Sequence, residues 1–301
     1  MQIINDYRLC EGFADGVALT LGNFDGVHLG HKAIIAETLK IVREKKLPAL
    51  LMTFEPHPVS LLRPGGAPFR ITSFKQKAAL LEKLGIDILL VMKFDRDFAN
   101  ISADEFVKDL LVRDLQTRHV VIGHDCNFGR NRGGNAEFLR AKAAEHGFGF
   151  TQLSPRGNAE PFSSTLIRNH IRKGEMPEAA GLLGHSFAVL GQVIEGDKRG
   201  RTIGFPTANL ELGDYVRPKF GVYVAEAKIA GMAYKSIANI GIRPTIGGEK
   251  ELLEVHILNW SWDIYGQEIE VEFKNFIREE KKFSNVEELK KQIAEDIAKL
   301  K

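Results

Sequence analysis

The sequence predicts an α/β domain followed by a small antiparallel β domain that carries a C-terminal helix. With 301 residues, the chain exceeds the size at which a single hydrophobic core grows efficiently, which favours two domains. Patterns typical of strands and of helices alternate up to about residue 184. After that point the segments are short, rich in β-branched and aromatic residues, and separated by glycines and prolines. We therefore expect domains at 1–184 and 185–301, with a link at about 175–190.

The first domain alternates strands with helices long enough to form crossover connections. A buried strand over 16–21 ends at Gly22, and apolar residues at helical spacing follow over 31–46. Ser102 and Glu105 form a capping-box pattern, which opens a helix that runs to about residue 114. The remaining elements are strands over 49–54, 88–91, 120–122 and 148–153 and helices over 75–84 and 134–146. This alternation predicts a parallel sheet of Rossmann-like type.

The second domain is expected to be a sandwich or a small barrel, because turn residues recur between short strand-like segments. The expected strands cover 187–194, 222–229, 235–240, 252–258 and 269–276. Ser284 and Glu287 form a second capping-box pattern, which opens a C-terminal helix over roughly 285–300.

Composition indicates an ordinary globular protein, with 44% hydrophobic and 27% charged residues. The net charge of +2, from 41 basic and 39 acidic residues, does not indicate a nucleic-acid partner. The cysteines, Cys10 and Cys126, are too few for a disulfide framework and favour a reducing compartment. The sequence has no apolar run of membrane-spanning length, so we expect a cytoplasmic protein without a membrane partner. The composition does not predict an oligomeric state.

A glycine-rich turn at 22–31 joins the first strand to the first helix. Ligands of parallel sheets bind beyond the carboxyl ends of the strands, and a helix N-terminus attracts phosphate. His28 and His31 could donate hydrogen bonds to a triphosphate as charge develops on leaving pyrophosphate. The alternative is that one histidine only caps the helix or packs beneath it. The glycine spacing of the pair favours the functional interpretation.

The string at 22–31 resembles the FMN adenylyltransferase module of prokaryotic FAD synthetases, in the nucleotidyltransferase superfamily. Segments at 53–58, 123–130 and 163–168 agree with that family in order and spacing, although Cys126 and Asn127 depart from its usual pattern. The resemblance implies that an FMN phosphate oxygen attacks the α-phosphorus of ATP and that pyrophosphate leaves, with Mg²⁺ as the expected metal. Catalysis is then mainly positioning and charge stabilisation.

The resemblance also implies the site residues of this first reaction. His28 and His31 would bind the triphosphate. The remaining ATP-binding residues would be Gly22, Asn23, Phe24, Asp25, Gly26, Gly30, Ser163, Ser164, Thr165 and Arg168. The flavin-binding residues would be His57, Asp125 and Phe128. By itself, the hydroxyl run at 163–165 is equally typical of a helix N-cap.

The second domain contains glycines at 196, 200 and 204 close to Lys198, which suggests a phosphate-binding flap. Thr207 and Asn209 offer a hydroxyl and an amide for a small cation. A basic hairpin loop and an ordinary turn are the alternatives. The string at 204–209 resembles riboflavin kinase, as do segments at 221–223, 239–245, 253–256, 263–266 and 276–283.

The second resemblance implies a six-stranded Greek-key barrel in which Thr207 and Asn209 hold Mg²⁺-ATP. Gly196, Lys198, Gly200 and Gly204 would complete the ATP site of the kinase. Glu254 would accept the proton of the riboflavin 5′-hydroxyl, and Arg278 would contact the flavin. From the pattern alone, Glu254 could equally be a solvent-facing residue of a half-exposed strand, and Arg278 a solvated charge.

Together the two resemblances imply a bifunctional enzyme that makes FMN from riboflavin and FAD from FMN. A tRNA-charging or RNA-binding protein would need a basic face and a lysine-rich signature in place of the serines at 163–164. A non-catalytic flavin carrier would not need Glu254 or the two histidines. A single-activity enzyme would have lost one set of signatures, and both sets are present in the sequence.

Overall fold

The computed structural model describes residues 1–9, 15–154, 162–196, 199–245 and 248–300. The chain forms two compact units. The first unit comprises Met1–Gly66 and Lys77–Ser163, and the second comprises Ala67–Gln76 and Ser164–Lys301. A short segment from the first half of the sequence, 67–76, therefore belongs to the second unit. The assignment of the two activities to 1–184 and 185–301 stays a prediction.

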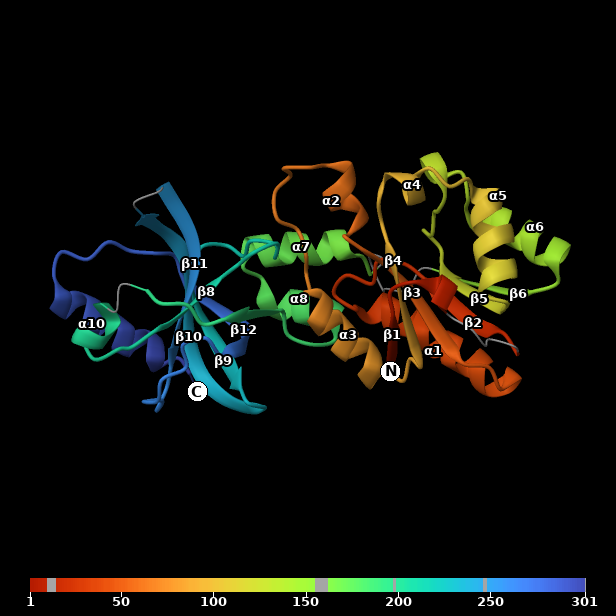
Figure 1. Cartoon of the computed structure of the whole chain (residues 1–301). Coiled ribbons are helices and arrows are strands. Elements are labelled where there is room, and N and C mark those ends of the chain that lie inside the picture. The colour runs from red at the N-terminus through yellow and green to blue at the C-terminus, as the bar shows by residue number, and fades with distance from the viewer. Residues whose placement is uncertain (10–14, 155–161, 197–198, 246–247, 301) are drawn as a thin grey trace. The chain divides into compact units, whose positions relative to one another are not determined.

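The first unit is built on a parallel sheet with the strand order β1-β4-β3-β2-β5-β6 (Figure 1). Its strands are β1 (Gln2–Ile4), β2 (Val17–Leu21), β3 (Ala49–Glu55), β4 (Ile88–Lys93), β5 (Thr117–Gly123) and β6 (Gly149–Leu153). The expected Rossmann-like α/β architecture is confirmed, and the edge strand β1 is an addition that the pattern did not predict. Strand β3, the next along the chain, pairs with one edge of β2, and the later strand β5 pairs with its other edge. This reversal is a topological switch point, where parallel sheets bind ligands.

Helices and short helical turns connect the strands of the first unit. They are η1 (Tyr7–Leu9), α1 (Leu29–Lys45), α2 (Pro58–Leu62), α3 (Phe74–Lys83), α4 (Arg96–Ala99), α5 (Ala103–Glu105), η2 (Phe106–Asp114), η3 (Arg130–Arg132) and α6 (Ala136–His146). The capping box of Ser102 and Glu105 is present at the start of α5, as expected. The helix continues through η2 with π-helical hydrogen bonding instead of regular α-helical turns.

The central strands of this sheet are buried on both faces. Val17 and Leu19 of β2 pack in one apolar cluster, whereas Ala18 packs in another with Ile41 of α1. Successive strand residues point to opposite faces, so a sheet covered on both sides needs apolar residues at every position. The continuous apolar run of β2 reflects this double burial.

The second unit contains a nearly closed antiparallel barrel with the strand order β7-β12-β9-β10-β11-β8. Its strands are β7 (Ala188–Gln192), β8 (Ala208–Glu211), β9 (Gly221–Ile229), β10 (Met232–Thr245), β11 (Gly248–Ile257) and β12 (Glu268–Arg278). A bridge between Ile194, just beyond β7, and Asn209 of β8 brings the two ends of the order together. The expected small barrel is therefore confirmed.

The helices of the second unit are α7 (Ser164–Lys173), α8 (Met176–Leu183), α9 (Arg199–Thr202) and α10 (Val286–Ile297). The expected C-terminal helix is present as α10, but its predicted cap is wrong by one residue. Asn285, and not Ser284, is the N-cap, because its side chain accepts a hydrogen bond from the Glu288 backbone at 2.9 Å. Ser284 instead donates its hydroxyl hydrogen to the Glu288 carboxylate at 2.9 Å.

The barrel separates its residues by strand face. Leu253 and Val255 of β11 lie in the apolar core with Ala238 and Ile240 of β10. The residues between them face the other side, where a second cluster joins Val222, Ile237 and Leu300 to Ile297 of α10. The C-terminal helix therefore packs on the outer face of the barrel wall, and the alternation in β11 places Glu254 on that same outer face.

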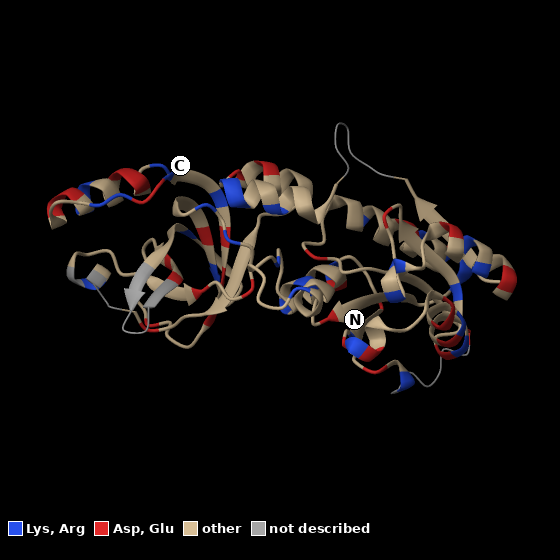
Figure 2. Ribbon diagram, turned by 90° about the horizontal axis from the view of Figure 1, so that it is seen from above, with Lys and Arg blue, Asp and Glu red and all other residues tan. Residues whose placement is uncertain are grey.

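In the part of the chain that the structure describes, none of the helices combines the length and the apolar character needed to cross a membrane. Acidic and basic residues are interspersed along the ribbon of each unit, including α10 (Figure 2).

Candidate functional site

The carboxyl edge of the parallel sheet brings together three of the sequence-predicted motifs. The 22–31 turn follows β2, the segment with His57 follows β3, and the 123–130 segment follows β5. Because β2 pairs with β3 on one side and with β5 on the other, the three loops begin at neighbouring positions of one edge. This edge includes the switch point of the sheet, where a nucleotide site is expected.

The turn after β2 is a rigid loop held by buried side chains. Phe24 and Val27 adopt left-handed backbone conformations with φ of 49° and 40°, and Gly26 lies at 83°. The Phe24 and Val27 side chains are buried, as is Asp25. Left-handed backbone is costly for residues with a Cβ, so it persists only where packing over-determines it. Phe24 therefore anchors the loop through its ring, and the side chain of Asn23 is the exposed one.

His28 and His31 meet at the start of α1. His28 is the N-cap of the helix, and its Nδ1 accepts a hydrogen bond from the His31 backbone N–H at 3.2 Å. The two imidazole rings stack with centroids 3.6 Å apart and planes 17° apart, and the Phe24 ring lies 4.9 Å from that of His31. The capping interpretation of His28 is thus correct, and it also fixes the His28 ring against that of His31.

Gly30 makes the close packing of this pair possible. A Cβ at position 30 would lie 3.0 Å from Cε1 of His28 and 3.2 Å from Cβ of Phe162. Glycine is favoured at position 22 for a similar reason, because a Cβ there would approach the Phe24 ring to 3.2 Å. These glycines allow close contact with protein rings, in addition to any approach of a ligand.

A buried lysine that the sequence did not single out supports the loop. Nζ of Lys77, on α3, lies 3.3 Å from the Asn23 carbonyl oxygen, 3.1 Å from Oγ1 of Thr53 and 3.1 Å from Oε1 of Glu55. The Thr53 hydroxyl also donates to the same Asn23 carbonyl at 3.2 Å. Lys77 is only 3% exposed. It therefore ties the loop after β2 to the end of β3.

The three residues predicted to bind flavin lie in different environments. His57 is buried and caps α2, with its Nδ1 accepting from the Val59 backbone at 3.2 Å. Asp125 is exposed at the carboxyl edge. Phe128 is buried in the core cluster, where its ring lies 5.0 Å from that of Phe106. This placement favours packing for Phe128, and its flavin contact stays a prediction.

The neighbouring Cys126 is a partly buried thiol that packs against the core cluster. Burial raises its pKa to about 12, with a smaller contribution from the nearby Asp125. A thiol with that pKa remains protonated and unreactive near neutral pH. Cys126 therefore acts as a packing residue of this loop.

The serine-rich signature lies at the boundary of the two units. Ser163 ends the first unit, and Ser164, Thr165 and Arg168 lie on α7 of the second. The buried face of α7 carries Ile167 and Ile171, so Thr165 is left on the exposed face.

Arg168 is fixed by the segment that joins the second unit from the first half of the chain. Its Nε donates to the Phe69 carbonyl at 2.7 Å, and its guanidinium lies 5.6 Å from the centroid of the Phe69 ring. Arg168 is therefore held in place on α7 by backbone and ring contacts within the second unit.

The candidate kinase residues form a row around the barrel. Glu254 of β11 pairs with Asn209 of β8 on one side and with Asn239 of β10 on the other. Asn239 in turn pairs with Val222 of β9, which pairs with Arg278 of β12. Directly paired residues lie on the same face of a sheet. Residues from five strands, distant in sequence, thus line one side of the barrel wall.

Asn209 and Gly196 pack tightly at one end of this row. A Cβ at position 196 would lie 2.4 Å from Nδ2 of Asn209, so only glycine leaves room for the amide. Asn209 is buried, and Thr207, two residues earlier, is half-buried. The structure therefore brings together Gly196, Asn209 and Glu254, three residues of the predicted kinase site.

The loop before Thr207 is also compact. A Cβ at position 200 would come within 2.3 Å of the Phe205 carbonyl oxygen, and Gly204 has a φ of 89°. His256 Nδ1 lies 2.8 Å from the Pro206 carbonyl oxygen, which ties this loop to β11. The predicted ATP contact of Lys198 falls outside the described residues.

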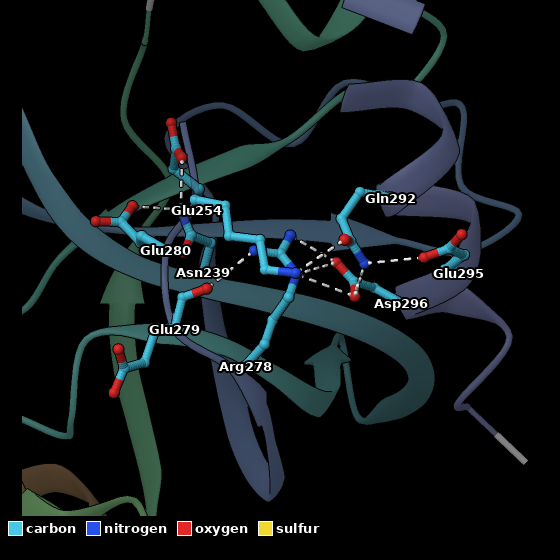
Figure 3. Close-up of polar contacts among 9 residues, drawn as sticks. Asn239, Glu254, Arg278, Glu279, Glu280, Gln292, Glu295 and Asp296 are labelled. Atoms are coloured by element: carbon cyan, nitrogen blue, oxygen red, sulfur yellow. Dashed lines mark hydrogen bonds and ion pairs between the residues drawn. The ribbon is translucent and has the colours of Figure 1, made fainter. Parts of the chain in front are cut away.

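Glu254 belongs to a chain of polar contacts that runs through Asn239 to Glu280 (Figure 3). Asn239 Nδ2 lies 3.4 Å from Oε2 of Glu254 and 3.1 Å from Oε1 of Glu280. The sequence did not single out Asn239 or Glu280, since their contacts depend on strand register and on the path of the chain after β12.

Arg278 lies beside this chain and pairs with α10. Its Nε and Nη2 donate to Oδ2 of Asp296 at 3.0 and 2.7 Å, and Gln292 donates to Oδ1 at 3.1 Å (Figure 3). The side chain of Asp296 is 2% exposed and that of Arg278 is 14% exposed. Arg278 therefore anchors α10 to the barrel, and its flavin contact stays a prediction.

Two family models match the two halves of the chain. A family model described as FAD synthetase matches residues 11–166, and one described as riboflavin kinase matches 183–301. A solved structure from Streptococcus pneumoniae, described as a macrolide-efflux protein, has a TM-score of 0.88 at 30% identity, covering 99% of this chain and 98% of that one.

Curated relatives match nearly the whole length of the chain. A bifunctional riboflavin kinase/FMN adenylyltransferase from Escherichia coli (strain K12) is 41% identical, covering 96% of this chain and 93% of that protein. The protein of the same name from Haemophilus influenzae is 41% identical, covering 99% of this chain and 97% of its own length. The chain therefore belongs to the family of bifunctional riboflavin kinase/FMN adenylyltransferases.

Proposed function

We propose that this chain makes FAD in two ATP-dependent steps, each carried by residues of its own half. The C-terminal half phosphorylates riboflavin to FMN, and the N-terminal half transfers the adenylyl group of ATP to FMN. Both activities are those of the family to which the chain belongs. The observation that carries the residue assignment is the pairing of Asn209 with Glu254 in the barrel, alongside the stacked His28 and His31 at the sheet edge.

In the kinase step, Glu254 is the proton acceptor. The 5′-hydroxyl oxygen of riboflavin forms a bond to the γ-phosphorus of ATP, and its proton passes to the Glu254 carboxylate. The bond between the γ-phosphorus and the bridging oxygen breaks, and ADP leaves with that oxygen. Glu254 is half-buried on the outer strand face, so its carboxylate can reach a bound hydroxyl.

The oxygen donors beside Glu254 fit a magnesium ion. Thr207 and Asn209 offer a hydroxyl and an amide oxygen, which are hard ligands of the kind that Mg²⁺ prefers. Asn209 is held in place against Gly196, where a Cβ would fill the space of its amide. We propose that these two residues hold Mg²⁺ together with ATP phosphates, with Gly196, Lys198, Gly200 and Gly204 around the nucleotide. The ion, when bound, neutralises phosphate charge.

In the adenylyl transfer, the protein positions the reactants and stabilises charge. A phosphate oxygen of FMN forms a bond to the α-phosphorus of ATP, and the bond to the α,β-bridging oxygen breaks, so pyrophosphate leaves. We propose that His28 and His31 donate hydrogen bonds to that pyrophosphate. The loop residues 22–26 and Gly30 would surround the nucleotide, and Ser163, Ser164, Thr165 and Arg168 would bind its outer phosphates.

The same proposal covers the remaining partners. His57 and Asp125 would contact the flavin of the adenylyl-transfer step, and Arg278 that of the kinase step. Riboflavin, FMN, FAD and ATP are the expected ligands, and a cytoplasmic location stays a prediction that rests on the sequence features given above.

The test is a time course with riboflavin, ATP and Mg²⁺, in which FMN and FAD are separated by chromatography. We expect FMN to appear first and then to fall as FAD accumulates. FAD without any FMN intermediate, or no ATP-dependent product at all, would contradict the proposed order of steps.

A His28→Ala variant tests the adenylyl-transfer step separately from the kinase step. It should abolish FAD formation from FMN and leave riboflavin phosphorylation at the wild-type rate. His146→Ala, at the C-terminal end of α6 in the same unit, is the matched control and should retain both activities. Wild-type FAD formation by the His28 variant would reject the assignment.

A Glu254→Gln variant tests the kinase step separately from the adenylyl-transfer step. It should eliminate riboflavin phosphorylation, while supplied FMN is still converted to FAD, because the amide cannot accept the hydroxyl proton. Glu226→Gln on β9 changes the same functional group elsewhere in the barrel and should keep both activities. Retained kinase activity in the Glu254 variant would refute its role.

A further inference from the structure

We infer that Asn239 is a positioning residue that orients the carboxylate of Glu254, and that Glu280, just after β12, supports Asn239 from the other side (Figure 3). This inference rests on the proposed role of Glu254 in the kinase step. It assigns a function to two residues outside the nucleotide-binding and flavin-binding sets proposed above.

Strand register places Asn239 beside Glu254. The two residues are direct partners in the antiparallel pair of β10 and β11, so their side chains leave the same face of the wall. Asn209 is the partner of Glu254 on the other strand. The carboxylate therefore stands between two amide side chains, one at the proposed metal site and the other at Asn239.

The chemistry of the neighbours determines how the Asn239 amide is oriented. Ionised carboxylates only accept hydrogen bonds, and an amide NH₂ has two hydrogens to donate. Nδ2 lies 3.1 Å from Oε1 of Glu280 and 3.4 Å from Oε2 of Glu254, which suits one hydrogen toward each. The flipped amide would turn its oxygen toward two carboxylates. In the described part of the chain, Oδ1 of Asn239 is buried without a hydrogen-bond partner, which is the cost of this orientation.

Two features place Glu280 at Asn239. Gly241 lies two residues further along β10, and a Cβ there would come within 2.1 Å of Oε1 of Glu280, so the carboxylate occupies the space that a side chain would take. Arg278, two residues before Glu280, is locked to the buried Asp296 of α10. The Arg278–Asp296 ion pair thus holds the chain at the end of β12, two residues before Glu280.

The arrangement gives Asn239 a role in catalysis through Glu254. The contact of 3.4 Å is long for a hydrogen bond, so it contributes orientation more than binding energy. Holding Oε2 sets the plane of the carboxylate and hence the direction in which its other oxygen meets the attacking hydroxyl. Misplacement of a reacting group by about 1 Å costs on the order of a hundredfold in rate.

The primary test is Asn239→Asp, which keeps the shape of the side chain but replaces the donor NH₂ by a carboxylate oxygen. We expect kcat of riboflavin phosphorylation to fall about ten- to a hundredfold, by the same positioning argument, while KM for riboflavin and ATP changes little. FMN-to-FAD conversion serves as the internal control. Asn275→Asp introduces the same change at an exposed position of β12 and should leave kcat unchanged.

A second variant disturbs the contact without changing any charge. Gly241→Ala should push the Glu280 carboxylate away from Asn239, since the strand backbone at this position accepts alanine. We expect a smaller fall in kcat, about two- to tenfold, again with KM nearly unchanged. Because Gly241→Ala leaves Asn239 unchanged, it tests the positioning role even if Asn239→Asp lowers the stability of the barrel.

Rescue by a double variant distinguishes positioning from a purely structural role. Asn239→Asp places a third carboxylate beside two others, and Glu280→Gln removes one of them and supplies an amide donor. We expect Asn239→Asp combined with Glu280→Gln to recover a substantial part of the lost kcat. Strictly additive losses in the double variant, or falls in kcat matched by equal rises in KM, would overturn the inference.

The outcomes separate this inference from the proposed function. An active Glu254→Gln variant would reject the proposed base and the positioning role together. An inactive Glu254→Gln variant with wild-type kcat in both Asn239→Asp and Gly241→Ala would reject the positioning role alone. Loss of kcat in all three variants supports both.

Discussion

The two halves of the chain build their sites in opposite ways. The loop at the edge of the parallel sheet is a continuous segment, 22–31, whose glycines, rings and helix cap determine one another locally. The row on the barrel wall draws Asn209, Glu254, Asn239 and Arg278 from four different strands. In the first site, neighbours in sequence are neighbours in space. In the second site, residues distant in sequence become neighbours in space only through strand register.

This difference has a physical consequence for how each site is stabilised. The loop is held by buried apolar residues, Phe24 and Val27, whose packing over-determines its strained backbone. The row is held by hydrogen bonds and one buried ion pair, which depend on partners brought from far along the chain. A local change should therefore impair the first site, whereas loss of a distant partner should impair the second.

The largest effect is expected where the barrel depends on the C-terminal helix. Arg278→Leu leaves the Asp296 carboxylate buried without its partner, and breaking a buried pair costs about 3–5 kcal/mol. We expect the barrel to unfold at markedly lower denaturant concentration, measured by loss of kinase activity and by calorimetry.

The double variant Arg278→Leu with Asp296→Leu sharpens this test. It removes both charges, so most of the lost stability should return. If Arg278 also contacts the flavin, KM for riboflavin stays high in the stable double variant. A normal KM would assign Arg278 to anchoring alone. An Arg278→Leu variant as stable as the wild type would show that the pair contributes nothing.

The second prediction tests the local site. Gly30→Ala puts a Cβ 3.0 Å from the His28 ring and 3.2 Å from Cβ of Phe162, so the histidine pair must shift. We expect FAD formation from FMN to fall about ten- to a hundredfold, because small displacements of positioned groups are costly. Kinase activity should be unaffected, and Gly181→Ala, whose Cβ would meet nothing within 4 Å, is the control. Equal loss in both variants would mean that the packing of the pair is irrelevant.

The same contrast explains what could be predicted from the sequence. The strand, turn and helix around 16–46 were predicted because their signals are local: an apolar run, spaced glycines and helical periodicity. The barrel strands were predicted with the exception of β8, which is a short strand that begins two residues after Pro206. The cap of α10 was misplaced because Ser284 and Asn285 are both good N-cap residues, and only geometry chooses between them.

The parts of the sites that could not be predicted are those that depend on register or burial. Asn239 lies in a segment that resembles riboflavin kinase, but a role for its side chain emerges only when β10 pairs with β11 and places it beside Glu254. Lys77 lies near Lys75 and Lys83 on the same helix, and only burial distinguishes it from them. Chemistry that follows from a local motif is readable from one sequence, whereas chemistry assembled by the fold is not.

The third prediction concerns the buried Lys77, which supports the 22–31 loop from a helix that is distant in sequence. Lys77→Met removes the donor that links the Asn23 carbonyl to Thr53 and Glu55. We expect a loss of about 1–3 kcal/mol in the stability of the first unit, because buried acceptors lose their partner. FAD formation should fall with it, measured as kcat with FMN. Lys83 is exposed on the same helix, so Lys83→Met should change neither stability nor kcat. A Lys77→Met variant with wild-type stability and kcat would show that the loop does not depend on Lys77.

The smallest expected effect is a pH-dependent one on the barrel, at Glu272 of β12, whose partners are Lys228 on the neighbouring strand β9 and Lys274 on β12 itself. Burial acts to raise the pKa of the Glu272 carboxyl, but hydrogen bonds from Lys228 and Lys274 outweigh it, so that pKa lies below its ordinary value. A lowered pKa in the folded state means that the stabilisation is present above the unfolded-state pKa and is lost as the pH falls through the folded-state value. Both lysines are partly exposed, so the contribution should stay below about 1 kcal/mol.

The measurement compares the wild type with Glu272→Gln in denaturant titrations from neutral pH to pH values below the carboxyl pKa. We expect the wild type to be the more stable at neutral pH and the difference to shrink on acidification. High salt should reduce the difference at neutral pH, because it screens exposed charges. A difference that grows on acidification would mean that burial outweighs the two lysines and that this cross-strand cluster destabilises the barrel.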